Sequence, residues 1–523
     1  MLHSLPASGE GLGRYYDSHS LRDLRHPQSL LAYEMNGECL PILRGRPLRL
    51  RVENQLGFKH VTWMTSSSCT ISETVTPGKA ATTKTTSSSG TATRSRTEGA
   101  QPMGTEQTFV IVGAGLAGAK AAEALREEGF QGRVVLIGEE GERPYERPPL
   151  SKGYLQGKSE KEKIYVHPEG WYAEHDIEVH HGSRVTSIDV AAHRVSHERG
   201  ADLGYDKLLI ATGASARQLP VPGADPHRVF TLRRVEDCEQ LKVTWKDASR
   251  VAIVGAGWIG LEVAAAARAA DLDVTVLETF ELPLLRVLGC DVAQVFADLH
   301  RRHGVDLRLG VQVAEITGED PARATGVRLA DGTHLDADLV VVGVGATPNT
   351  ELAEAAGLAV DNGITVDEHL RTSDPDIYAA GDVANAYHPS LGKHIRIEHW
   401  SNALNQPATA AKTMLGGDAV YDRVPYFYTD QYELGMEYSG YVEPGDYDEV
   451  VFRGDKDALT FVAFWLKDRR VLAGMNVNVW DVTDDVQALI RSGQKVDSTR
   501  LADTQIPLSD VVTVSRAASG APG

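Results

Sequence analysis

The chain has 523 residues and a formal net charge of -19, with 42% hydrophobic and 24% charged residues. These values are ordinary for a globular protein and exclude a collagen-like, a wholly disordered and a membrane-embedded chain. No apolar run approaches the ~20 residues that a membrane-spanning helix needs, so we expect no membrane partner. The acidic balance also argues against nucleic acid as a partner, because neutralising phosphates requires clustered Lys and Arg.

The first hundred residues differ from the rest of the chain. Residues 1–102 carry 12 basic and 8 acidic side chains, whereas the remainder carries 41 and 64. Residues 1–64 have a mixed composition, and in residues 65–96 Ser and Thr occupy 18 of 32 positions. With so few large apolar side chains to offset the entropy of ordering, residues 65–105 are expected to form a disordered linker. The first residues lack the apolar core of a secretory signal, which favours a cytoplasmic protein.

Residues 109–139 have the pattern of a strand, a glycine turn, a helix and a second strand. Gly113, Gly115 and Gly118 form a G-x-G-x-x-G turn between the apolar run FVIV and an alanine-rich helical segment. Such glycines allow a tight turn, close approach of the backbone to a pyrophosphate and close helix packing, and the helix N-terminus attracts the phosphate charge. The next strand ends at Glu139, where a carboxylate can bind a ribose. This unit therefore predicts a dinucleotide site.

Residues 250–278 repeat the same arrangement. Gly255, Gly257 and Gly260 open the second helix, and Glu278 ends the strand that follows. Glu278 would repel a ribose 2′-phosphate, and no Arg follows it in ETFELP, so NADH is expected to be preferred over NADPH. The alternative is a solvated or helix-capping acid. Two dinucleotide sites in one chain imply hydride transfer between a nicotinamide and a flavin.

The rest of the chain completes the predicted architecture. Apolar runs at 206–214, 337–349 and 376–385 each stop at a Gly- or Asp-bearing turn, and aromatic-rich alternating segments follow Val424. The predicted fold class is α/β, with two Rossmann-like dinucleotide-binding domains and a small C-terminal α+β domain. The predicted boundaries are 106–222 with 346–422 for the first domain, 223–345 for the second and 423–515 for the C-terminal domain.

Several spaced motifs then point to one family. They are ERPYERPPLSKGYL at 142–155, ATG at 211–213, VGVGATPNTEL at 342–352, AAGDV at 379–383 and IEHWSNALNQ at 397–406. Together they resemble the FAD-dependent ferredoxin and rubredoxin reductases of the pyridine nucleotide-disulphide oxidoreductase superfamily, which are relatives of apoptosis-inducing factor. The resemblance covers about residues 106–510, and it implies FAD in the first domain and NADH in the second.

The resemblance also implies two sets of cofactor-binding residues. The FAD set is Gly113, Ala114, Gly115, Gly118, Glu139, Glu140, Arg147, Lys152, Val185, Ala211, Thr212, Gly213, Arg233, Asp382, His399, Trp400 and Tyr428. The NAD set is Gly255, Gly257, Trp258, Ile259, Gly260, Glu262, Glu278, Gly343, Val344 and Gly345. Two alternatives stay open: Arg147 and Arg233 as surface cations, and His399 as a satisfied polar residue near the core.

Lys152 and Glu262 are the predicted catalytic residues. By resemblance they form an ion pair beside the reactive flavin nitrogen, where a cation favours the anionic reduced flavin and the carboxylate fixes the lysine. Glu262 lies two residues past Gly260, in the first turn of the second helix. The alternative is that Glu262 only complements the helix dipole.

The positions of the cysteines limit the kinds of redox centre that the chain can contain. Cys39, Cys69, Cys238 and Cys290 lie far apart, which excludes a disulfide framework, a zinc ribbon and a C-x-x-C dithiol, and no metal site is expected. Residues 139–160 contain no Cys, so the chain lacks the redox pair of a disulfide reductase. Within the resembled family, electrons then leave the flavin for an external carrier.

The predicted function is therefore an NADH:ferredoxin or rubredoxin oxidoreductase whose iron–sulfur partner serves an oxygenase or a cytochrome P450. We expect a monomer or a homodimer. Two alternatives are direct reduction of a small acceptor, and a redox sensor resembling apoptosis-inducing factor in which NADH binding changes assembly.

The segment LAYEMNGECLP within residues 30–64 resembles another family, the molybdopterin-binding domain of sulfite-oxidase-like oxidoreductases. Only that fragment is present, in residues 1–64, so molybdenum binding is not expected. Codons exist for residues 67–94 that, in a shifted frame, spell a continuation of that domain. We hypothesise that a frameshift joins the fragment to a reductase that starts at Met103, which the nucleotide sequence can test.

Overall fold

The structure is a computed structural model. It describes residues 107–225, 229–319 and 323–512, and the backbone of short strands between Leu2–His3 and Val61–Met64. The chain divides into two compact units, Met1–Ala100 and Gln101–Gly523. The predicted linker 65–105 lies outside the described residues.

The first unit contains small antiparallel sheets. The three-stranded sheet has the order β3 (Ser29–Ala32), β6 (Leu48–Val52), β7 (Val61–Met64). Two pairs accompany it: β1 (Leu2–His3) with β2 (Tyr16–Asp17), and β4 (Glu34–Met35) with β5 (Glu38–Cys39).

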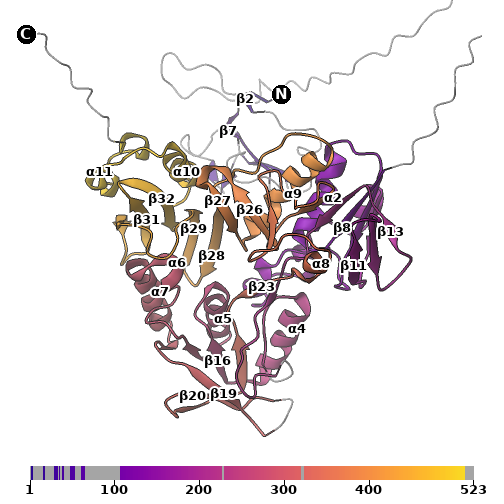
Figure 1. The fold of residues 1–523 in the computed structure, drawn as a ribbon. Coiled ribbons are helices and arrows are strands. Elements are labelled where there is room, and N and C mark those ends of the chain that lie inside the picture. The colour runs from indigo at the N-terminus through magenta and orange to yellow at the C-terminus, as the bar shows by residue number, and fades with distance from the viewer. Residues whose placement is uncertain are drawn as a thin grey trace, which may run out of the picture. The chain divides into compact units, whose positions relative to one another are not determined.

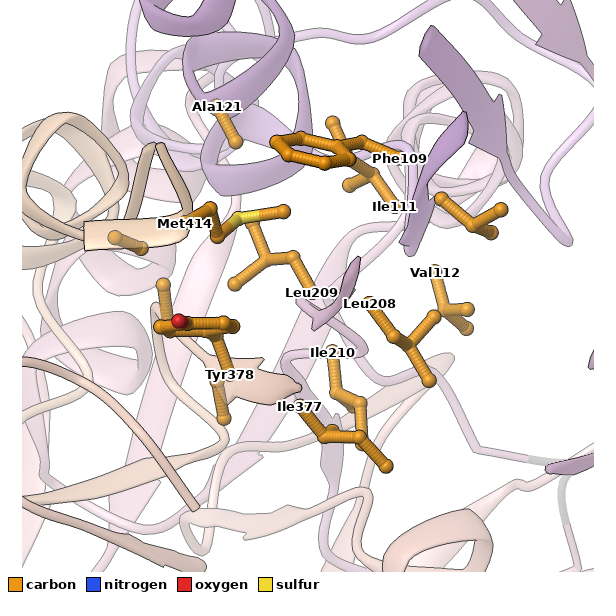
Figure 2. Packing of buried hydrophobic residues seen from close by; sticks show 14 of the residues in the cluster. Phe109, Ile111, Val112, Ala121, Leu208, Leu209, Ile210, Ile377, Tyr378 and Met414 are labelled. Carbon is orange, nitrogen blue, oxygen red and sulfur yellow. The ribbon is translucent and has the colours of Figure 1, made fainter. Parts of the chain in front are cut away.

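The second unit begins with a five-stranded parallel sheet. Its order is β10 (Ile177–His180), β9 (Arg133–Ile137), β8 (Thr108–Val112), β14 (Lys207–Ile210), β25 (Ile377–Ala379). The central strands are continuous apolar runs because both faces of a parallel sheet are covered. Helices α2 (Leu116–Glu127) and α9 (Trp400–Met414) pack against each other, and Figure 2 shows Ala121 and Met414 beside Phe109 and Leu209 in this core.

Smaller elements surround this first sheet. They are the sheet β11 (Val185–Asp189), β12 (Arg194–His197), β13 (Leu203–Gly204), the sheet β24 (Ile364–Val366), β26 (Ala384–His388), β27 (Lys393–Arg396), and the helices α3 (Trp171–Glu174) and α8 (Glu351–Ala355). A 3-10 helix, η4 (Pro148–Ser151), places Lys152 at its C-terminal end.

A second parallel sheet forms the next domain. Its order is β18 (Asp306–Arg308), β17 (Asp273–Leu277), β16 (Arg250–Val254), β22 (Leu339–Val342), with helices α4 (Val235–Thr244), α5 (Trp258–Ala269), α6 (Leu285–Leu288) and α7 (Cys290–Arg302). A small antiparallel sheet of β19 (Val313–Thr317), β20 (Gly326–Leu329) and β21 (His334–Asp336) lies at the far end of this domain in Figure 1.

Two strands connect the parallel sheets. β15 (Ala214–Ala216) follows β14 of the first sheet, and β23 (Ala346–Pro348) follows β22 of the second. The two connecting strands pair antiparallel with each other, from Ala214 opposite Pro348 to Ala216 opposite Ala346. The polypeptide therefore crosses from one parallel sheet to the other twice, both times through this pair of strands.

The C-terminal domain is a five-stranded antiparallel sheet with short helices. Its order is β28 (Tyr426–Gln431), β29 (Leu434–Gly440), β32 (Arg470–Val477), β31 (Thr460–Lys467), β30 (Glu449–Asp455), and α10 (Thr483–Ser492) and α11 (Ser498–Ala502) follow it. Phe461, Phe464 and Trp465 of β31 are fully buried. Two parallel sheets with helices and this small α+β domain confirm the predicted fold class. Within the described residues, no helix has the length and apolarity needed to span a membrane.

Candidate functional site

A cavity of about 1040 Å³ lies at the carboxyl ends of the parallel strands β8 and β22. Ligand pockets usually measure roughly 300–1,000 Å³, so this one has room for more than one small molecule. Its lining includes most of the predicted FAD set: Gly113, Ala114, Gly115, Glu139, Glu140, Arg147, Lys152, Val185, Ala211, Thr212, Gly213, Arg233, Asp382, His399, Trp400 and Tyr428. It also includes Gly257, Trp258, Ile259, Glu262, Gly343 and Gly345 of the predicted NAD set. Both glycine turns therefore face one continuous space.

The glycine turns have the shape that binding a phosphate requires. Gly113 and Gly255 adopt φ of +112° and +102°, which favours glycine. Gly115 and Gly257 are the N-cap residues of α2 and α5; no side-chain hydrogen bond caps either helix, and no described atom lies within 4 Å of the position that a Cβ would take. The first N–H groups of both helices therefore face open space, which fits the pyrophosphate of FAD at one turn and of NADH at the other.

Five of the predicted residues are not among those that line the cavity. They are Gly118, Gly255, Gly260, Glu278 and Val344. A Cβ on Gly118 would lie 1.9 Å from the Gly113 carbonyl oxygen, and one on Gly260 would lie 2.1 Å from that of Gly255. These third glycines therefore let each helix pack against its own turn.

Glu278 supports the second turn directly. Its carboxylate accepts hydrogen bonds from the backbone N–H groups of Ala256, at 2.8 Å, and Phe280, at 3.0 Å. Val344 packs against the apolar cluster of the second domain. The contact between Glu278 and a ribose stays a prediction, and the structure adds a role for this carboxylate in holding the turn.

Lys152 and Glu262 meet inside the cavity, although 110 positions separate them in the chain. The Lys152 ammonium donates to Glu262 Oε1 at 2.6 Å, and the two side chains are 17% and 4% exposed. The hydroxyl groups of Ser151 and Thr429 also donate to the carboxylate, Thr429 at 2.5 Å to Oε1. Three donors offset the cost of burying the Glu262 charge, so Glu262 does more than complement the dipole of helix α5.

The C-terminal domain contributes an aromatic side to the site. The Lys152 ammonium lies 5.4 Å from the centre of the Tyr428 ring, and Tyr428 meets Trp400 edge to face at 5.9 Å. Partial burial raises the pKa of the neighbouring Asp430, Lys152 lowers it and Glu262 raises it further. Tyr428 and Trp400 therefore form an aromatic part of the cavity lining near the ammonium group.

Three ion pairs lie along the cavity wall. They are Arg147 with Glu140 at 2.9 Å, Arg233 with Asp382 at 2.6 Å and Arg234 with Glu139 at 3.1 Å. Burial acts to raise the pKa of Glu140, but Arg147 and Tyr145 lower it more, so this carboxylate is ionised at neutral pH. Arg147 and Arg233 are thus paired within the wall, which differs from the surface-cation alternative.

His399 presents an unpaired polar atom. Its Nδ1 is buried without a hydrogen-bond partner among the residues that the structure describes. Desolvation lowers the pKa of His399 to about 4, against the opposing effect of Asp382, so the imidazole is neutral at neutral pH. A buried polar atom beside a cavity needs a partner, and a bound dinucleotide can supply one.

Sequence reasoning missed four polar residues of this site: Ser151, Arg234, Thr429 and Gln431. Ser151 lies inside the quoted RPPLSK motif, so its position next to Lys152 was a usable signal. Thr429 and Gln431 had no such signal, because alternating polar residues in YFYTDQ also fit a strand whose polar face is in solvent.

Comparison with protein-family models divides the chain into three matched parts. Residues 107–407 match the pyridine nucleotide-disulphide oxidoreductase family. Residues 426–512 match a reductase C-terminal domain. Residues 2–77 match the oxidoreductase molybdopterin binding domain, in agreement with the resemblance noted for the N-terminal fragment.

Individual proteins resemble the second unit over almost their whole length. The chain is 40% identical over 403 residues to the 5,5'-dehydrodivanillate O-demethylase ferredoxin reductase subunit of Sphingobium sp., covering 77% of this chain and 97% of that protein. It is 38% identical over 419 residues to putidaredoxin reductase of Pseudomonas putida, covering 79% and 99%. The solved structure of a covalent putidaredoxin reductase–putidaredoxin complex matches with a TM-score of 0.74 and 38% identity, over 77% of this chain and 98% of that chain.

Proposed function

Since the chain belongs to the pyridine nucleotide-disulphide oxidoreductase family, we propose that its cavity holds FAD against the first glycine turn and NADH against the second. The chain is an FAD-dependent oxidoreductase that takes electrons from NADH and passes them to an iron–sulfur protein of an oxygenase or cytochrome P450 system. The observation that carries the assignment of the site is the Lys152–Glu262 pair, which lies in the cavity that both glycine turns face.

Bound FAD supplies the chemistry that converts a two-electron donor into single-electron transfer. The residues of this chain prepare the place for it. The helix N-termini after Gly115 and Gly257 bind phosphate groups, and Lys152 places positive charge in the cavity beside the Tyr428 ring. Glu262 holds the lysine in place.

The described cysteines support an external electron acceptor. Cys238 and Cys290 are both free, and neither lines the cavity. Cys238 is buried with its thiol directed at the Leu150 carbonyl oxygen, and burial raises its pKa to about 12, so it is not a reactive thiolate. The acceptor that we propose is a ferredoxin-type protein, the kind that the names of the two relatives imply. A cytoplasmic location and a monomeric or dimeric state are parts of the same proposal.

A reconstituted electron-transfer assay tests this function. Purified full-length protein is expected to contain FAD and to be bleached by NADH under anaerobic conditions. Reduction of cytochrome c is expected to accelerate strongly when a ferredoxin is added, and a panel of ferredoxins and rubredoxins then identifies the carrier class. Fast reduction of oxygen or a quinone without stimulation by any carrier contradicts the proposal, as does slow bleaching that stops at a persistent charge-transfer complex.

A further inference from the structure

Strand β28 buries an unusual face. Its residues alternate in exposure, and the inward positions are Phe427, Thr429 and Gln431, which are 9%, 1% and 1% exposed. Two of these three residues are polar. A buried hydroxyl and a buried amide are costly without hydrogen-bond partners, so their partners show what this face does.

The partners form a continuous chain of hydrogen bonds that ends at the Lys152–Glu262 pair. His300 of α7 lies with Nε2 2.9 Å from Gln431 Oε1. Gln431 Nε2 donates to Thr429 Oγ1 at 3.2 Å, and Thr429 Oγ1 donates to Glu262 Oε1 at 2.5 Å. This hydrogen-bond chain therefore joins helix α7 of the second domain to the carboxylate that holds Lys152.

Chemistry sets the direction of every bond in this chain. An ionised carboxylate only accepts, so the Thr429 hydroxyl must use its single hydrogen on Glu262. Thr429 then accepts from its other neighbour, which requires Gln431 to present its N–H group there and its oxygen to His300. His300 must in turn carry its hydrogen on Nε2. All the donors point toward Glu262, an arrangement in which each bond polarises the next.

The far end of the chain is consistent with this direction. His300 is fully buried, and burial lowers its pKa to about 4, so at neutral pH it carries one ring hydrogen. Its Nδ1 is then an acceptor, and the Tyr432 hydroxyl lies 3.4 Å from it. Tyr432 stacks on His303, with ring centres 3.7 Å apart.

We propose that His300, Gln431 and Thr429 are positioning residues that set the charge of the Lys152–Glu262 pair. Thr429 and Lys152 share the same oxygen of Glu262. Because the hydrogen-bond chain takes up part of the Glu262 charge, Glu262 neutralises less of the Lys152 charge. The ammonium group then presents more positive charge to the cavity. This inference rests on the proposed function, since it assumes that the cavity beside Lys152 holds the flavin.

The test compares variants along the chain with a matched control. Thr429→Val and Gln431→Leu remove the donors, whereas Thr429→Ser keeps the hydroxyl. Asn476→Leu is the control, because Asn476 is a buried amide in strand β32 of the same sheet that bonds to Glu437 and the Val479 carbonyl, not to Glu262. The readouts are the midpoint potential of bound FAD, the limiting rate of its reduction by NADH and the dissociation constant of NADH.

Thr429→Val and Gln431→Leu are expected to lower the midpoint potential, because Lys152 is then more fully neutralised. The limiting rate is expected to fall about 10-fold, the size of one lost hydrogen bond to a charged group, with NADH affinity unchanged within about twofold. Thr429→Ser is expected to restore both values, and Asn476→Leu to change neither. Nitrogen-15 NMR of histidine-labelled protein is expected to show His300 with its hydrogen on Nε2.

Several results overturn the inference. A midpoint potential that rises or stays constant in Thr429→Val and Gln431→Leu excludes the charge-sharing role. If Asn476→Leu shifts the potential by the same amount, the shift comes from disturbed packing of the sheet and the charge-sharing role is also excluded. A hydrogen on His300 Nδ1 contradicts the donor direction. If wild-type protein binds FAD and is reduced by NADH while the variants match it, only this inference fails. Wild-type protein that binds no FAD overturns the proposed function, and this inference with it.

Discussion

Lys152 illustrates how much of the site depends on single side chains. It is 17% exposed, it lines the cavity, and it shares the Glu262 carboxylate with two neutral donors. Preorganised charge of this kind accounts for much of catalysis, and losing one such group typically costs roughly 100-fold or more in rate.

Lys152→Met is therefore expected to slow FAD reduction by NADH about 100-fold while the flavin stays bound. Stopped-flow absorbance measures the rate. Lys161→Met is the control, since Lys161 is a half-exposed lysine that pairs with Glu142 and Glu239. Equal rates for Lys152→Met and the wild type would remove the role assigned to this ammonium.

Glu278 is the residue on which nicotinamide specificity depends in this proposal. Glu278→Gln keeps one oxygen acceptor for the Ala256 N–H group and removes the negative charge that repels a 2′-phosphate. We expect the ratio of kcat/KM for NADPH over NADH to rise about 10-fold, on the order of one charge interaction in a partly solvated site. Asp273→Asn, which removes the same charge at an exposed position at the start of the strand that precedes Glu278, should leave the ratio unaltered.

At the scale of elements, the two glycine turns contain positions where a substitution is expected to weaken cofactor binding without destabilising the fold. Gly115 and Gly257 have free space at the Cβ position and extended backbone, with φ of -86° and -80°. An alanine there folds normally but places a methyl group where the backbone should approach a pyrophosphate. Gly115→Ala is expected to yield folded protein that loses FAD, and Gly257→Ala to keep FAD and raise the KM for NADH.

Gly118→Ala provides the contrast, because its methyl group would lie 1.9 Å from the Gly113 carbonyl oxygen. It is expected to destabilise the fold by roughly 1–3 kcal/mol, as overpacking usually does. Thermal unfolding of the apoprotein and the flavin-to-protein absorbance ratio measure the two effects. If Gly115→Ala retains full flavin, the pyrophosphate does not lie against the first turn.

The same elements mark what the sequence could predict. Both strand–turn–helix–strand units could be predicted because their hydrophobic periods and glycines are local. The structure has β8, α2, β9 and β16, α5, β17 in these segments, although β9 and β17 end at Ile137 and Leu277, before Glu139 and Glu278. The Lys152–Glu262 contact spans 110 positions and was implied only by resemblance. The polar inner face of β28 could not be read, because burial of Thr429 and Gln431 depends on α5 and α7, whose positions follow from tertiary packing.

At the scale of the whole molecule, the second unit contains the apolar clusters and the cavity that the structure describes. The apolar clusters of the described residues lie between Phe109 and Val512, and the cavity is lined by residues from Val112 to Tyr428. A chain that starts at Met103 is expected to fold, to bind FAD and to be reduced by NADH at the rate of the full-length protein. Loss of flavin or a slower rate would assign the first unit a part in the reaction.

The paired strands β15 and β23 have a mechanical consequence. Both connections between the parallel sheets run through this short ribbon, with Ala214 and Pro348 at the end joined to the first sheet and Ala216 and Ala346 at the end joined to the second, so the ribbon tethers the two sheets. Lys152 belongs to the first domain and Glu262 to the second, so their salt bridge is a second link between the two domains. Since the 2.6 Å distance joins atoms of different domains, the salt bridge requires that the two domains be aligned.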